Sequence, residues 1–357
     1  MTVFGIAGCT ALLICGLGIR DTVISLKPRQ YGEAGVVRYD LMAVTADDDY
    51  AAARDELLDA DEVDELLGLR IDSVTAEFDG VRESVQIMVV PDGTDLSSYL
   101  KMESLDGRAL TVPAGGALIT KNAEQVLGFA LGDNVTLQDS SLRQGEVRID
   151  DIVLNYLGNF VFMDQSTYRE AFGKDAAPNA FLALLNGGDD AQIAFADALA
   201  ADDLFMTVSS TARIANDFSE SFKIVDVVVY VVTVMAAALA FAVVFTLSTT
   251  NISERERELA TIKVLGFRRR EVYRYINKET VILTLVGIVA GFPLGYAITR
   301  SLTVILRMPS LYFDTLVELP TYAIAAAMSL LFTLIINAIT NRSLDRVDMV
   351  GALKSAE

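Results

Sequence analysis

The sequence predicts an α-helical membrane domain of four transmembrane helices, with an α+β domain inserted between helices 1 and 2. Three observations lead to this fold class. The 357 residues are 52% hydrophobic and yet carry a net charge of −19. The apolar residues gather in four long runs, and most of the negative charge lies between the first two runs. A chain of this length can hold a membrane module together with one or two soluble units.

Four segments are long and apolar enough to cross a bilayer, because a helix rises ~1.5 Å per residue and the hydrocarbon core is ~30 Å thick. A buried core helix would explain one such run, but not four in one chain. An alternative for the first run is a signal peptide, but it lacks the basic flank and the cleavage pattern of one. The four runs, none of which contains a charged residue, are 2–19, 227–247, 280–298 and 322–339.

The distribution of Lys and Arg predicts the orientation of the chain. Residues 251–279 carry eight basic and five acidic side chains, whereas residues 20–223 carry 16 basic and 37 acidic ones. Loops rich in Lys and Arg stay in the cytoplasm. We therefore expect a multi-pass protein of a bacterial cell (plasma) membrane, with both termini cytoplasmic and residues 20–223 outside.

The extracytoplasmic domain shows a mixed α and β pattern. A strand–helix–strand order near its end is typical of an α+β layer. Residues 211–223 contain no helix breaker, so they predict one long helix that continues into the second span as a stalk. Strands are expected at 36–45, 74–78, 85–90, 135–137, 147–154, 160–163, 180–185 and 205–209, and helices at 51–67, 122–127 and 191–200.

These elements define an expected layout along the chain. It comprises transmembrane helix 1 (1–19), the extracytoplasmic α+β domain (20–210), the stalk with transmembrane helix 2 (211–250), a cytoplasmic coupling loop (251–279), transmembrane helix 3 (280–305), a short extracytoplasmic loop (306–319), transmembrane helix 4 (320–340) and a cytoplasmic tail (341–357).

Composition argues against several kinds of chemistry. The chain has no His, which removes His-based catalytic triads and the commonest transition-metal ligand. Both cysteines, Cys9 and Cys15, lie in the first apolar run, so the outer domain has no disulfide or Cys-based zinc site. The run 47–49 of three Asp lacks the spacing of a calcium loop and is interpreted as solvated surface. We expect no catalytic residues, metal or cofactor, and no nucleic-acid partner, since an acidic domain repels phosphates.

The loop between the second and third spans has a distinctive sequence. Residues 254–266 read Glu-Arg-Glu-Arg-Glu-Leu-Ala-Thr-Ile-Lys-Val-Leu-Gly. This pattern predicts a short helix over 258–265, which Gly266 ends in a left-handed conformation. A positive-inside anchor explains the arginines of the loop, but not its apolar residues, which need a surface to pack against.

This loop, together with Glu279 thirteen residues after Gly266, resembles the FtsX-like permeases of ABC transporters (type VII), a group that includes macrolide exporters and lipoprotein-release permeases. The four-span layout and the segment 122–133 share the resemblance. It implies that 258–266 is a coupling helix that docks on a separate ATP-binding cassette ATPase. The residues implied in that coupling are Glu258, Leu259, Ile262, Lys263, Leu265, Gly266, Arg268 and Glu279.

The resemblance also implies how such a chain works. ATP-driven movement of the ATPase would pass to the outer domain by mechanotransmission, and a second permease unit would complete a homodimer or heterodimer. The substrate is unknown: a lipid, lipoprotein, peptide or drug-like molecule. This chain has no Gly-x-x-x-x-Gly-Lys-Ser/Thr loop, so the partner is expected to bind the ATP.

Two alternative functions are a membrane regulator of cell-wall hydrolases driven by an ATPase partner, and a ligand-sensing membrane receptor. A receptor needs a signalling domain, which a loop of residues 251–279 and a short tail do not supply. Family members usually begin with a basic amphipathic segment before the first span. Since this chain begins one residue before that span, it resembles the C-terminal module of a longer permease, or its start codon has been placed too late.

The third span carries glycines at i, i+4 and i+8, namely Gly287, Gly291 and Gly295. Such a stripe lets another helix approach closely. The partner helix is either in the same chain or across a dimer seam. Pro293 is expected to bend the span.

Overall fold

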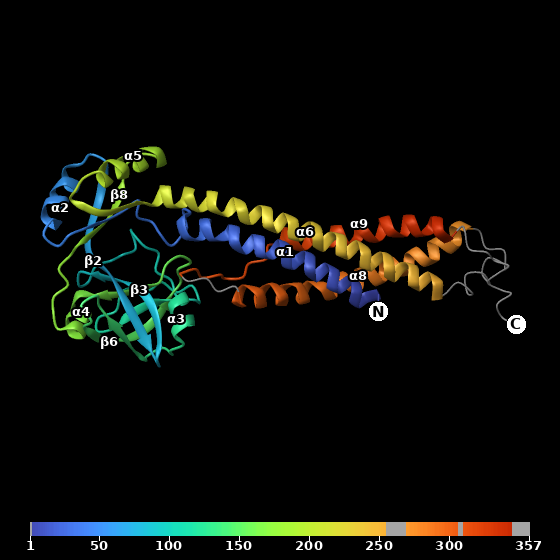
Figure 1. The fold of residues 1–357 in the computed structure, drawn as a ribbon, viewed down its shortest axis with the longest axis horizontal. Helices are drawn as coiled ribbons and strands as arrows, with labels where there is room; N and C mark the ends of the chain where they lie inside the picture. The colour runs from blue at the N-terminus through green and yellow to red at the C-terminus, as the bar shows by residue number, and fades with distance from the viewer. Residues whose placement is uncertain (1, 255–268, 306–309, 345–357) are drawn as a thin grey trace. The chain divides into compact units, whose positions relative to one another are not determined.

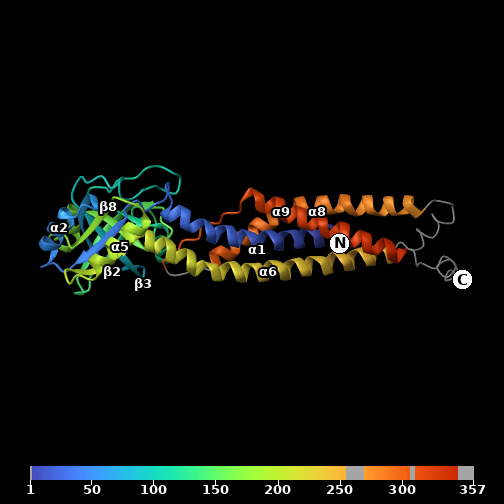
Figure 2. The ribbon, with the colours of Figure 1, turned by 90° about the horizontal axis from the view of Figure 1, so that it is seen from above.

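The computed structural model describes residues 2–254, 269–305 and 310–344. The chain divides into two compact units. The helical unit comprises Met1–Val23, Lys223–Leu306 and Asp314–Glu357, and the α+β unit comprises Ile24–Phe222 and Arg307–Phe313. Figures 1 and 2 show the helices of the first unit and the strands of the second.

Four long helices supply the helical unit, and they run side by side in both views (Figures 1 and 2). Each contains an apolar stretch long enough to span a membrane. The predicted four-span layout, with a sheet-rich domain between the first two spans, is thus confirmed in the described residues. The helices are α1 (Thr2–Tyr31), α6 (Thr211–Glu254), α8 (Arg269–Ile305) and α9 (Leu319–Leu344).

All four helices extend beyond their apolar runs, and α1 and α6 do so on the side of the α+β unit. The first run ends at Ile19, but α1 continues to Tyr31, because loss of hydropathy marks where a helix leaves apolar surroundings and not where its backbone unwinds. One long helix, α6, begins at Thr211 as predicted. With 44 residues it is about 66 Å long, roughly twice the hydrocarbon thickness of a bilayer.

The first helix lies at the centre of the helical unit. In the most apolar stretch of α1, 56% of the residues are buried inside the structure. The corresponding share is 12% for α6 and 28% each for α8 and α9. Ile6 packs with residues of the other three helices, Val244, Ile288 and Ile336. A buried hydrogen bond of 3.0 Å also joins Thr10 to Ser329 of α9. Helix α1 is therefore the most buried of the four helices.

The α+β unit contains a closed ring of six strands. Each strand in the following order pairs with the next, and the last pairs again with the first. Closure leaves these strands no open edge. The ring runs β2 (Val63–Phe78), β3 (Val81–Val90), β7 (Phe160–Asp164), β4 (Ala117–Thr120), β6 (Gln144–Val153) and β5 (Asn134–Gln138).

Two short helices pack on the ring, α3 (Lys121–Leu127) and α4 (Gln165–Phe172). The carboxylate of Asp164 caps α4 by accepting the Thr167 N–H at 2.8 Å, which satisfies one of the N–H groups that a helix start leaves unpaired.

A second layer continues from the first half of β2. The antiparallel order is β2, β8 (Ala180–Leu185), β1 (Leu41–Thr45) and β9 (Phe205–Ser210). Two helices, α2 (Tyr50–Asp59) and α5 (Asp189–Ala200), share an apolar core with these strands. Tyr50 of α2 stacks on Phe181 of β8 with ring centroids 4.6 Å apart. The long strand β2 therefore belongs to both layers.

Three expectations for this unit need correction. The predicted helix over 51–67 is wrong in its second half: α2 ends at Asp59, and residues 63–67 open β2. Pairing of Leu66 and Leu67 with β8 overrides the local helical pattern. The strand expected over 36–45 begins only at Leu41. Helix α4 was not predicted.

Candidate functional site

The predicted coupling residues fall mostly outside the described part of the chain. This applies to Glu258, Leu259, Ile262, Lys263, Leu265, Gly266 and Arg268. The remaining one, Glu279, is half-buried on α8. The assignment of these residues to a coupling helix therefore stays a prediction.

The glycine stripe of α8 faces α1 of the same chain. A Cβ on Gly291 would lie 2.7 Å from Thr10 Cβ and 2.9 Å from the Ala7 carbonyl oxygen. Gly287 meets Ile6 and Gly295 meets Ile14 at similarly short range. Ile6, Thr10 and Ile14 are also spaced i, i+4, i+8, so the two rows lie against each other. The two backbones can approach this closely only because α8 has no side chain there.

A buried polar junction fixes the end of α1 within the α+β unit. Gln30 is 2% exposed and Asn155, in the loop between β6 and β7, is 4% exposed. The Gln30 side chain donates from Nε2 to Asn155 Oδ1 at 2.9 Å and accepts the Tyr156 N–H on Oε1 at 3.0 Å. Because a buried amide that loses a partner costs its full desolvation energy, these bonds hold the helix end to the loop.

The same loop holds the connection between α8 and α9. Gly158 N–H donates to the Ser310 carbonyl at 2.8 Å, and Tyr312 N–H donates to the Tyr156 carbonyl at 3.0 Å. The rings of Tyr156 and Tyr312 stack with centroids 6.2 Å apart. Residues 154–159, here called the junction loop, thus bond both the last turn of α1 and residues 310–312.

The start of α6 is attached to the second sheet layer. Helix α6 follows β9 with no intervening residue. Thr211 N–H donates to the Asp40 carbonyl at 2.9 Å, and Thr211 Oγ1 donates to the Tyr39 carbonyl at 2.7 Å. Asp40 in turn accepts the Leu185 N–H at 2.8 Å through Oδ2. These bonds join the first residue of α6 to the two residues before β1, and Asp40 links those residues to β8.

Within the helical unit, α1 also caps the start of α9. Asp21 Oδ2 accepts the Glu318 N–H at 3.2 Å and the Thr321 hydroxyl at 2.5 Å. Thr22 Oγ1 donates to the Leu316 carbonyl at 3.0 Å and accepts the Leu316 N–H at 3.1 Å. A carboxylate at a helix N-terminus is favourable because the N–H groups there are unpaired and the helix dipole is positive.

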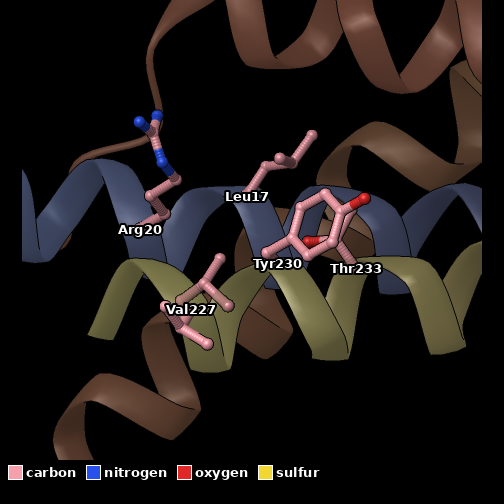
Figure 3. A pocket seen from close by; sticks show the side chains of 6 residues that line it. Leu17, Arg20, Val227, Tyr230 and Thr233 are labelled. Atoms are coloured by element: carbon pink, nitrogen blue, oxygen red, sulfur yellow. The ribbon is translucent and has the colours of Figure 1, made fainter. Parts of the chain in front are cut away.

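A groove of about 460 Å³ lies between α1 and α6 of the helical unit. Figure 3 shows Leu17 and Arg20 from α1 and Val227, Tyr230 and Thr233 from α6, with the guanidinium of Arg20 directed away from Val227. The Thr233 hydroxyl is buried and has no hydrogen-bond partner in the described structure. The groove is mostly apolar, and Arg20 is the one charged side chain among the described residues that line it, so the groove can receive an apolar group.

Sequence reasoning did not find the junction residues. Gln30 and Asn155 are separated by 125 positions, and neither belongs to a motif. Only the pairing of distant segments identifies them. The glycine stripe, by contrast, carried a recognisable spacing.

Comparison with known proteins supports a permease. Residues 230–344 match the family model for the FtsX-like permease C-terminal domain. The chain is 30% identical over 104 residues to the uncharacterized ABC transporter permease YvrN of Bacillus subtilis (strain 168). That alignment covers 29% of this chain and 24% of YvrN, so it spans about a quarter of the relative.

Two solved structures are also similar. The extracellular domain of the noncanonic ABC-type transporter YknZ from Gram-positive bacteria aligns at 15% identity and a TM-score of 0.30, over 47% of this chain and 99% of that one. The periplasmic region of MacB from Actinobacillus actinomycetemcomitans aligns at 10% identity and a TM-score of 0.31, over 51% and 94%. At TM-scores below 0.5 a shared fold does not follow. The chain thus has four helices that are long and apolar enough to cross a membrane, and its residues 230–344 are similar to the C-terminal domain of FtsX-like permeases.

Proposed function

We propose that this chain is the transmembrane subunit of an ABC transporter, which couples ATP hydrolysis by a separate ATPase to movement of an extracytoplasmic domain. The observation that carries the proposal is the permease-domain match at 230–344, which encloses the basic loop 251–279. The chain itself would be non-catalytic. A second permease unit and an ATP-binding cassette ATPase would be its partners, and a lipid, lipoprotein, peptide or drug-like molecule its substrate.

The charge distribution supports the orientation in this proposal. The acidic segment 20–223 has a net charge of −21 and the loop 251–279 a net charge of +3, from the counts of basic and acidic residues in each. A membrane orients such a chain with the basic loop in the cytoplasm. The α+β unit then lies outside, and both termini lie inside.

The attachments in the α+β unit support a mechanical function. Three segments continue into the helical unit. Helix α1 and the α8–α9 connection are hydrogen-bonded to the junction loop, and α6 is hydrogen-bonded to the residues just before β1. Of these, α6 enters its strand without a linker. A displacement of a membrane helix would therefore load backbone hydrogen bonds of the domain and would not be absorbed by a flexible tether.

The decisive experiment changes the apolar face of the loop. Leu259→Asp and Leu265→Asp place a charge where a hydrophobic contact with the ATPase is expected. We expect both variants to insert in the membrane at normal levels and to lose co-purification of the ATPase. The matched control is Leu142→Asp, because Leu142 is 76% exposed on the α+β unit. Unchanged co-purification of the ATPase with both loop variants would disprove the coupling assignment.

A further inference from the structure

A cavity of about 200 Å³ lies in the α+β unit, beside the junction loop, and Gln30 and Asn155 form part of its lining. Its wall is formed by the last turn of α1, the segment that leads into β1, strands β3 and β7, residues 100–102, the end of β6 with the junction loop, and the first turn of α6. It therefore sits where segments distant in sequence converge.

The wall of the cavity is largely apolar and adaptable. Met42, Met88 and Met102 line it together with Phe160 and Phe162. The two phenylalanine rings stack with centroids 5.8 Å apart. Methionine side chains are flexible and fit irregular guests. Apolar cavities of ~150 Å³ stay dry and accept small apolar molecules, so this cavity suits an apolar guest better than water.

The size of the cavity restricts the guest further. Pockets for drug-sized ligands measure ~300–1,000 Å³. A volume of about 200 Å³ is below that range. It favours one slim chain over a compact polycyclic molecule or a pair of chains.

The apolar wall of the cavity includes one positively charged side chain, that of Lys101. Lys101 is the only charged side chain among the described residues that line the cavity. Its Nζ lies 3.0 Å from Glu103 Oε1, and its side chain stays 33% exposed, so it remains accessible to a second anion. Acidic side chains outnumber basic ones in the segment 20–223, so a positively charged side chain at the cavity differs from the overall charge of the segment. Charge complementarity therefore selects an anionic head group.

A phenol beside the cavity adds a hydrogen-bond donor. Burial raises the pKa of Tyr39, and the neighbouring Tyr31 raises it further. Both tyrosines line the cavity. The Tyr39 hydroxyl thus keeps its proton throughout the physiological range and can donate to an oxyanion.

We propose that this cavity binds the acyl chain of a fatty carboxylate, with the chain among Met42, Met88 and Met102 and the carboxylate at Lys101. This site goes beyond the transport function proposed above and does not depend on an ATPase. The binding can therefore be tested on the purified chain alone.

The test uses the full chain in phosphatidylcholine nanodiscs with a dodecanoate that carries a photoreactive diazirine near its methyl end. After illumination, labelled peptides are mapped by mass spectrometry. We expect labelling of the peptides that contain Met88 and Met102, which lie outside the apolar spans. Labelling confined to the spans would overturn the proposal, because it would report partition of the probe into lipid only.

Charge variants test the head-group contact. Lys101→Glu should reduce labelling of those peptides about fivefold, the effect of losing one partly exposed ion pair. Lys174→Glu is the matched control, since Lys174 has the same 33% exposure and an Asp139 partner away from the cavity. The corresponding photoreactive dodecanol should label wild type as weakly as dodecanoate labels Lys101→Glu. Equal labelling by acid and alcohol would disprove recognition of the carboxylate.

A filling variant tests occupancy of the cavity. Met42→Trp reduces the available volume and should abolish labelling at Met88 and Met102. Met206→Trp is its control, because Met206 is 72% exposed and does not line the cavity. Labelling of Met42→Trp at the wild-type level would show that the chain lies elsewhere. The surface variant Lys101→Glu keeps the test informative if Met42→Trp fails to fold.

Discussion

At Gln30, a single side chain bonds the last turn of α1 to the junction loop. Gln30→Ala removes both hydrogen bonds and leaves Asn155 Oδ1 and the Tyr156 N–H buried without them. We expect the free energy of unfolding of the α+β unit to fall by ~1–3 kcal/mol per unsatisfied group. Denaturant unfolding of the full chain in detergent would measure it. Gln144→Ala, at an exposed position of β6, should leave stability nearly unchanged, and an equal loss in both variants would contradict this interpretation.

A Gly→Ala substitution is expected to destabilise the protein in the glycine stripe of α8 but to stabilise it at an open position of α1. Gly291→Ala adds a methyl group 2.7 Å from Thr10 Cβ, so α1 and α8 must separate, and we expect a loss of ~1–3 kcal/mol. Gly8→Ala on α1 meets nothing within 4 Å. Alanine is there the better helix former by up to ~1 kcal/mol. SDS titration of the purified protein would compare them. A shift of the same sign and size in both variants would disprove close packing at Gly291.

At the scale of elements, local pattern and distant pairing decided different parts of the fold. Helices α3 and α5 and strands β5, β7 and β8 could be predicted, because their apolar spacing lies within a few residues. The start of β2 could not be, because Leu66 and Leu67 fit a helix face until β8 pairs with them. The glycine stripe likewise predicted a close helix contact but not that α1 makes it. The Gln30–Asn155 bond carried no local signal at all.

The hairpin between β5 and β6 makes a prediction about acid stability. Burial alone would raise the pKa of Asp139, but the N–H groups of Arg143 and Ser141, together with Lys174, outweigh it and lower the pKa. A carboxyl whose folded pKa is lowered stabilises the fold above its unfolded pKa of about 3.9, and this contribution is lost as the pH falls through the folded value.

Asp139→Asn should therefore destabilise the α+β unit at neutral pH, and its difference from wild type should shrink below about pH 4. Urea unfolding at a series of pH values would measure the difference. Asp48→Asn, at an exposed position of the loop before α2, is the control. A difference between wild type and Asp139→Asn that stays constant down to pH 2 would contradict the assignment.

At the scale of the whole molecule, charged and apolar residues lie in different parts of the chain. This separation explains why the order of spans and outer domain could be predicted from the sequence. Uncharged runs predicted the spans, since a bilayer tolerates few charges at its centre. The net charge of −21 over residues 20–223 marked the α+β unit as a separate body. The point at which α1 ends and the α+β fold begins could not be predicted. Composition suggests a boundary at Lys27, Pro28 and Arg29, but α1 remains helical through these residues.

Orientation is the property of the whole chain that the charge pattern predicts most directly. Ser140→Cys, at an exposed position of the β5–β6 hairpin, should react with a membrane-impermeant maleimide in spheroplasts. Ser355→Cys in the C-terminal tail should react only after the membrane is permeabilised. Cys9 and Cys15 are buried in α1, so their background should be low, and replacing both with Ala would remove it. Protection of position 140 together with labelling of position 355 would reverse the topology, and the basic loop 251–279 could then not meet a cytoplasmic ATPase.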